Sequence, residues 1–97
     1  MHVYHVYILA SWTRVLQVGG TSNLENRIAQ HRSGSLGGFT CRYRVTRLVH
    51  VEPLGDVGDA IAREKQIKGW LRSKKISLVS AHNPQLRDLA AAQSGNP

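Results

Sequence analysis

Two residues of this 97-residue chain could act together on a phosphate, because Arg27 and His31 are four positions apart and share one helical face. The fork of an arginine binds two phosphate oxygens, and a histidine can contact phosphate or polarise a neighbouring group. Tyr7 adds a phenol that serves as a base only where nearby positive charge lowers its pKa from about 10. Hydrolysis of a phosphodiester needs a cation for the phosphate, a base for water and help for the leaving oxygen, and these residue types fit that reaction.

Glu64 is the acidic residue that most needs an explanation. It falls in the apolar stripe of an expected helix, where burial of an unpaired carboxylate would cost several kcal/mol. A carboxylate there needs a cation, and one Mg²⁺ with water in its remaining positions would suffice. An ion pair with Arg27, or a place at the edge of the stripe with the carboxylate in water, are the plainer alternatives.

The chain is strongly basic: thirteen Lys and Arg residues against six Asp and Glu give a formal charge of +7. This excess on a small domain predicts an anionic partner, most often nucleic acid, and a merely basic surface is the alternative. We expect backbone contacts from two basic runs, one of Arg42, Arg44 and Arg47, the other of Lys65, Lys68, Arg72, Lys74 and Lys75. Tyr43, Phe39 and Trp70 are candidates for stacking on bases, although Phe39 and Trp70 also suit a core.

Composition removes several other classes of protein. The single cysteine, Cys41, excludes an internal disulfide and a zinc site built from several thiolates. The longest uncharged apolar run, residues 6–10, is far shorter than the roughly 20 residues of a membrane span. The N-terminus lacks the basic and apolar regions of a secretory signal. We therefore expect a cytoplasmic protein with no membrane contact.

Hydrophobic patterning predicts a small mixed domain. Alternating and β-branched residues predict three strands, at residues 2–10, 14–19 and 46–51. In the first of these strands, Val3, His5, Tyr7 and Leu9 lie on one face of the sheet, and Tyr4, Val6 and Ile8 lie on the other. We expect Gly19-Gly20 to break the second strand, either as an ordinary strand end or to let the backbone approach a ligand closely, and Pro53 to Gly55 to end the third strand.

Helix signals separate and follow these strands. Ser22 and Glu25 fit a capping box, residues 33–40 read as a glycine-rich loop, and Asp56 fits an N-cap. Behind Asp56, residues at helical spacing predict an inward stripe of Val57, Ala60, Ile61, Glu64, Ile67 and Leu71. A short helix is expected over 74–81, and Asn83-Pro84 predicts the start of a last one. We expect one domain over residues 1–92 and a flexible tail over 93–97.

The order of several motifs resembles a known family. They are Val6-Tyr7-Ile8, Leu16 to Thr21, Leu24 to His31 with its Arg-x-x-x-His spacing, Ala60 to Trp70 with its Ala-x-Ala-Arg-Glu-Lys-Gln block, and the closing Asn83-Pro84 and Arg87-Asp88-Leu89. Together they resemble the GIY-YIG nuclease superfamily, in particular its small single-domain bacterial branch, over roughly residues 3–90. The resemblance implies an α+β fold, a three-stranded antiparallel sheet flanked by three or more helices.

The resemblance also implies roles for individual residues. Tyr7 matches the first signature tyrosine, and Arg27 matches the arginine that holds the scissile phosphate. His31 matches the helix histidine, and Glu64 the glutamate that binds Mg²⁺ or Mn²⁺. Asn83 could be the family's asparagine near the C-terminus, and it is equally explained as a helix cap.

One departure from the family pattern affects the expected activity. The second signature motif, Tyr-Ile-Gly, reads Gln17-Val18-Gly19, so its tyrosine is absent. A glutamine amide can position water but cannot act as a base near neutral pH. The expectation is a metal-dependent endonuclease acting on DNA, with RNA or branched nucleic acid as other substrates. Three outcomes are open. The protein is a weak nuclease that uses Tyr7, a nuclease whose base is instead Tyr4 or His31, or a nucleic-acid-binding module that no longer cuts.

Overall fold

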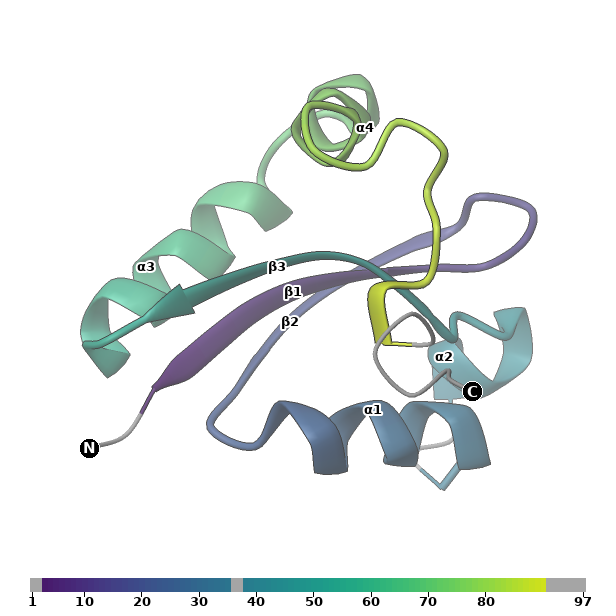
Figure 1. Cartoon of the computed structure of the whole chain (residues 1–97), viewed down its shortest axis with the longest axis horizontal. Helices are drawn as coiled ribbons and strands as arrows, with labels where there is room; N and C mark the ends of the chain where they lie inside the picture. Colours follow the sequence, from purple (N-terminus) through teal and green to yellow (C-terminus); the bar gives the residue numbers. More distant parts are fainter. Residues whose placement is uncertain (1–2, 36–37, 91–97) are drawn as a thin grey trace.

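The computed structural model describes residues 3–35 and 38–90 in three layers, with a central sheet between two layers of helices. Figure 1 shows α3 and α4 on one side of the sheet and α1 and α2 on the other. In chain order the elements are β1 (Tyr4–Ala10), β2 (Leu16–Thr21), α1 (Leu24–Ser33), α2 (Gly38–Tyr43), β3 (Arg47–Leu54), α3 (Val57–Lys68) and α4 (Arg72–Ser80). No helix within these residues is long and apolar enough to cross a bilayer. The expected tail over 93–97 lies outside the described residues.

The sheet has three antiparallel strands in the order β2-β1-β3, which confirms the predicted fold class. The central strand, β1, is the most apolar, and its side chains alternate between two cores as the sequence predicts. Val6 and Ile8 enter the core under α3 and α4. Tyr7 and Leu9 enter the core over α1, where they meet Ile28. Burial on both faces makes β1 the element that fixes the other layers.

Two strand ends differ from the sequence prediction. β2 continues through Gly19 and Gly20, which pair with Tyr7 and Val6 of β1. A glycine weakens a strand but keeps both backbone hydrogen-bonding groups, so ladder pairing can continue through it. β3 continues through Pro53, which lies opposite His5. Because β3 is an edge strand, the missing N–H of this proline is tolerated.

Three helix predictions also need correction. The N-cap of α1 is Asn23, whose Oδ1 accepts from the Asn26 amide at 3.1 Å, rather than Ser22. The expected loop over 33–40 instead leads into the short helix α2. The stripe of α3 is narrower than predicted, since only Ala60 and Ile67 of α3 are buried. The N-cap at Asp56 is confirmed, because its carboxylate accepts from the amides of Gly58 and Asp59.

Asn83 does not begin a helix. Its amide is buried and donates to the carbonyls of Val49 and Arg87, while its Oδ1 accepts from the Arg87 amide at 3.0 Å. A side chain that satisfies three backbone groups at once fixes a turn, and the following segment crosses the end of β3 instead of coiling. Helical backbone returns only at Leu89 and Ala90 within the described part of the chain.

An ion pair fixes α3 to the sheet. The Arg63 guanidinium donates to both carboxylate oxygens of Glu52 on β3, at 2.8 and 2.9 Å, and His50 lies 2.8 Å from the same carboxylate. The hydrogen bond from Arg63, with smaller contributions from His50, holds the pKa of Glu52 at about 2 despite partial burial. Because Arg63 directly precedes Glu64, this pair also sets where the Glu64 carboxylate lies.

Candidate active site

The centre of the site is a contact between β1 and α1. The Tyr7 hydroxyl lies 3.2 Å from Nε2 of His31, and the two rings meet edge to face with centroids 5.9 Å apart. Both side chains are buried. The two residues are 24 positions apart in sequence, so the packing of α1 under the sheet brings them together.

Burial keeps both members of this pair uncharged at neutral pH. Burial, together with the adjacent positive charge of Arg27, lowers the pKa of His31 below its ordinary value. Burial raises the pKa of Tyr7, while the charge and hydrogen bond of the Arg27 guanidinium oppose the increase. Nδ1 of His31 is buried and has no hydrogen-bond partner in the described structure. A neutral phenol thus lies against a neutral imidazole whose Nε2 can exchange a proton with it.

Arg27 lies one helical turn before His31 and is half-buried. It acts electrostatically on both Tyr7 and His31. Among residues 3–35 and 38–90, no ion pair joins Arg27 to a carboxylate, so the alternative of a bond with Glu64 is not found. A guanidinium beside a phenol and without an acidic partner suits an anion such as phosphate.

Two consecutive glycines on β2 make room for the site. A Cβ at Gly19 would lie 2.5 Å from the Tyr7 hydroxyl and 2.6 Å from Cζ of the same ring. A Cβ at Gly20 would lie 2.7 Å from Oε1 of Glu64 and 3.6 Å from Cε1 of Tyr4. Neighbouring strand residues point to opposite faces, so Tyr7 and Glu64 reach the same short stretch of β2 from opposite sides of the sheet. The charge of Glu64 is also felt at the Tyr7 phenol.

Glu64 lies at the edge of the α3 stripe with 24% of its side chain exposed, and its carboxylate pairs with Lys68 at 2.6 Å. An exposed pair of this i,i+4 type contributes about 0.3–0.5 kcal/mol, so another cation can displace the ammonium. No group of three potential ligands from His, Cys, Asp and Glu occurs in the described residues. One partly exposed carboxylate beside a bare glycine fits Mg²⁺, which keeps most of its water ligands, and does not fit zinc.

Gln17 occupies β2 opposite Leu9, on the same face of the sheet as Gly19 and Tyr7. Its amide Nε2 lies 3.5 Å from the Val18 carbonyl, at the limit of a hydrogen bond, and makes no other hydrogen bond within the described residues. The side chain is half-buried. An amide this weakly held can turn to position a water or a substrate oxygen, but it cannot remove a proton.

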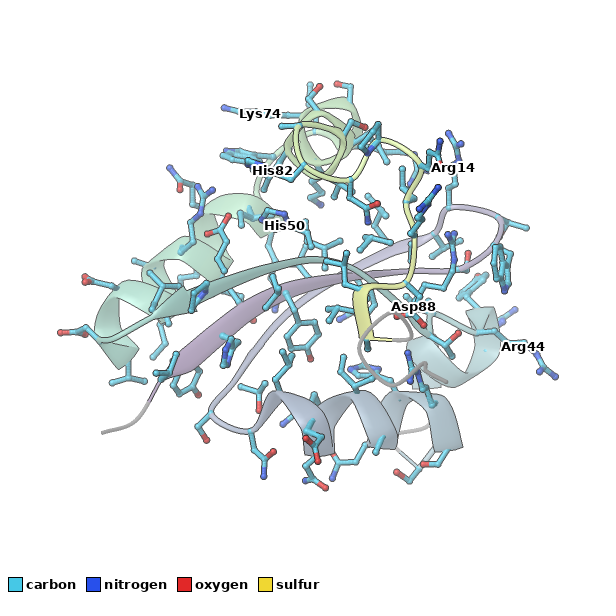
Figure 2. All side chains as sticks on the ribbon, in the orientation of Figure 1. Arg14, Arg44, His50, Lys74, His82 and Asp88 are labelled. Carbon is cyan, nitrogen blue, oxygen red and sulfur yellow. The ribbon has the colours of Figure 1, made fainter. Side chains whose placement is uncertain are left out.

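The predicted basic residues do not form one surface. Arg42 and Arg44 are exposed in and after α2, and the residues of the second run lie on α3 and α4. Arg47 begins β3 and is buried, so the prediction that it contacts nucleic acid is wrong. Figure 2 shows Lys74 and Arg44 on opposite sides of the sheet. Lys74 and Arg63 lie over the Trp70 ring, 4.4 and 5.2 Å from its centroid, so Trp70 is held within the protein's own contacts. The side chain of Phe39 lies outside the described part of the structure.

The sequence prediction missed the role of Lys68 as a partner of Glu64. The i,i+4 spacing of a glutamate before a lysine in an expected helix is a signal that could have found it. The prediction also treated Gly19 and Gly20 as a strand break, whereas the clash of any Cβ with Tyr7 or Glu64 depends on tertiary contacts.

The fold is the one that the resemblance to GIY-YIG nucleases implies, and direct comparison confirms the family. The sequence matches the GIY-YIG catalytic domain over residues 3–77. Since this match spans most of the chain, the protein belongs to the GIY-YIG nuclease family.

Curated relatives and a solved structure place it in a small single-domain group of that family. The chain is 37% identical over 82 residues to a UPF0213 protein of Syntrophus aciditrophicus (strain SB), covering 84% of this chain and 93% of the relative. It is 35% identical over 77 residues to a UPF0213 protein of Natronomonas pharaonis, covering 79% and 91%. The solution NMR structure of a UPF0213 protein from Bacillus halodurans is similar with a TM-score of 0.59, at 26% identity, covering 96% of this chain and 99% of the other.

The two glycines generate a prediction about stability. Gly19→Ala places a methyl group within 2.5 Å of the hydroxyl of the buried Tyr7 ring, so we expect a loss of about 1–3 kcal/mol. Gly20→Ala meets only the end of the flexible Glu64 side chain and should cost less than about 1 kcal/mol. Urea unfolding measures both, with Gly55→Ala as the control because nothing lies within 4 Å of its added Cβ. Equal losses for Gly19→Ala and Gly55→Ala would contradict this account of the site.

Proposed function

We propose that this protein is a divalent-metal-dependent endonuclease that hydrolyses phosphodiester bonds in DNA, and that it is slow because Gln17 replaces the second signature tyrosine. The observation that carries the proposal is the buried bond between Tyr7 and His31, with Arg27 beside both. Arg27 lies beside the Tyr7 phenol and pairs with no carboxylate among the described residues. Such an arginine is better explained by an anionic substrate than by a structural role. Membership of the GIY-YIG family supports the same reaction class.

The proposed chemistry begins with the phosphate, which the Arg27 guanidinium binds through its non-bridging oxygens. Tyr7 then removes a proton from water while its own proton passes to Nε2 of His31. The water oxygen bonds to phosphorus, the bond from phosphorus to the leaving oxygen breaks, and that oxygen takes a proton from solvent. This sequence needs no phenolate at the start, which agrees with the raised pKa of Tyr7.

Glu64 is the proposed metal ligand. When bound, Mg²⁺ or Mn²⁺ would stabilise the negative charge on the leaving oxygen, with water in the positions that Glu64 does not fill. When the metal ion binds, Lys68 would release the Glu64 carboxylate and become available to the nucleic acid backbone. Lys65, Arg72, Lys74 and Lys75, on the same side of the sheet, extend this contact, while Arg42 and Arg44 contact the strand on the other side.

A binding module without cleavage is the second candidate, and Gln17 is the observation that favours it. If the missing tyrosine is the base in this family, the Tyr7–His31 pair would position the strand without activating water. DNA is the proposed substrate in both cases, and RNA and branched DNA are the other nucleic acids to test.

Nicking assays separate the two candidates. We expect wild-type protein to nick supercoiled DNA slowly with Mg²⁺ or Mn²⁺, and Glu64→Ala to lose at least about 100-fold in rate. Gln17→Tyr should raise the rate by up to about 10²–10⁴-fold, the usual contribution of general base catalysis. Glu25→Ala, which removes an exposed carboxylate of α1, should leave the rate unchanged. Nicking that survives Glu64→Ala would reject the metal site, and activity only in Gln17→Tyr would identify the natural protein as a binder.

The pH dependence of nicking tests the proton acceptor. His31 must be neutral to accept the Tyr7 proton, and its pKa lies below the ordinary 6.5. The rate should therefore be constant from neutral pH down to about 6.5 and fall below it with a slope of one proton. His31→Gln should be slower and should lose this acid limb. A midpoint above pH 7, or the same limb in His31→Gln, would contradict the assignment.

A further inference from the structure

Trp12 is a large aromatic side chain that the fold holds in place without burying it. It lies in the turn between β1 and β2 and is 80% exposed. Its ring lies over the guanidinium of Arg47, 4.2 Å from the ring centroid. Arg47 is only 7% exposed and donates to the carbonyls of Ser11 and Leu86. The indole therefore rests on a fixed support and keeps its other surface free for a ligand.

A hollow connects this indole to the active site. It has a volume of about 410 Å³ and is lined by Trp12, Arg44, Thr46 and the end of α1. His31, the partner of Tyr7, also lines it. Its size falls within the range of small-ligand pockets. The hollow therefore places Trp12 on the side of His31 away from Tyr7, where the part of a nucleic acid next to a phosphate at Arg27 could lie.

The surroundings of the hollow are positively charged. Arg32 and Arg44 line it. The Arg32 guanidinium is paired with the Asp88 carboxylate at 2.5 Å, so Arg44 is the lining residue whose charge remains available to a ligand. Arg14, two positions after Trp12, and Arg44 are both exposed and both have left-handed backbone, with φ of 65° and 54°. Figure 2 shows these two arginines at the same end of the sheet. Glycine or asparagine is favoured at such positions, so two arginines there impose a conformational cost that anion binding would offset.

We propose that Trp12 stacks on an unpaired nucleobase beside the scissile phosphate, with Arg14 and Arg44 contacting the flanking phosphates. This proposal rests on the proposed function, because it takes nucleic acid as the substrate. A base within a duplex has neighbours on both faces, so a side chain that stacks on a base needs a free end, a flap or a branch point. The site would direct the enzyme to the junction between single- and double-stranded nucleic acid.

Binding measured in EDTA tests this inference without cleavage. The probes are a fluorescent six-nucleotide dT strand and an abasic strand of the same length, compared by anisotropy at low salt. Wild-type protein should bind the dT strand about 5- to 150-fold more tightly than the abasic strand, the contribution of one stacked base. Trp12→Ala should bind both strands equally, and Trp12→Phe should restore most of the preference. Because Trp12 is exposed, its variants are expected to fold.

Leu71→Ala is the matched control, since Leu71 is 79% exposed and lies between α3 and α4, across the sheet. It should bind as wild type does. Equal binding of the two strands by wild-type protein, or the same loss for both strands in Trp12→Ala, would overturn the stacking role. If Trp12→Ala loses the base preference and the wild-type protein does not nick DNA, the stacking role is upheld and the proposed nuclease activity is rejected. Failure of the wild-type protein to bind any strand would overturn both.

Discussion

The pairing of β1 with two bare glycines of β2 is the constraint on which the site depends. Tyr7 and Glu64 belong to opposite layers of the molecule, one facing α1 and the other carried by α3. An ordinary side chain at Gly19 or Gly20 would occupy the space that one of them uses. The sheet therefore separates the two cores, and Tyr7 and Glu64 lie against neighbouring residues of β2 from its two faces. Arg63 and Glu52 reinforce the arrangement by fixing α3 on the opposite edge.

Electrostatics bear on how the proposed reaction would proceed with a glutamine at position 17. The Tyr7–His31 pair is buried and neutral, and Arg27 makes loss of the tyrosine proton less costly while it makes gain of a proton by His31 more costly. Burial of both groups keeps the resting pair neutral. Gln17, on the same face, carries an amide that would orient water or substrate in the proposed reaction. In the proposed reaction, these contacts would divide the base function between Tyr7 and His31.

Local patterns predicted the elements that local physics determines. The alternation along β1 gave both faces correctly, and Asp56 caps α3 as its residue type indicates. The spacing of Arg27 and His31 placed both on α1. Residues whose role depends on distant partners were misjudged: Asn83 looks like a helix cap in sequence, but its partners are on β3 and the following turn. Pro53 looks like a strand end, and only the position of β3 at the sheet edge permits it to continue the strand.

In the candidate site, too, the roles that depend on distant partners could not be predicted from the sequence. Family resemblance supplied Tyr7, Arg27, His31 and Glu64, while periodicity alone left the partner of Glu64 undecided between a metal, Arg27 and water. The structure adds Lys68 as that partner. Trp12 carried no sequence signal beyond a turn, because its support by Arg47 joins residues 35 positions apart. Exposed aromatic residues become informative only when the group beneath them is known.

The most direct test of the shared site is Mn²⁺ titration followed by amide NMR. Paramagnetic broadening falls steeply with distance from the ion, so it reports which amides surround it. The account predicts that amides of Gly19, Gly20 and Tyr7 on the sheet broaden together with those flanking Glu64 on α3, and that Glu64→Ala abolishes all of these effects. Broadening that persists in Glu64→Ala, or that centres on Asp56 and Asp59, would show that the ion binds elsewhere and that Tyr7 and Glu64 do not form one site.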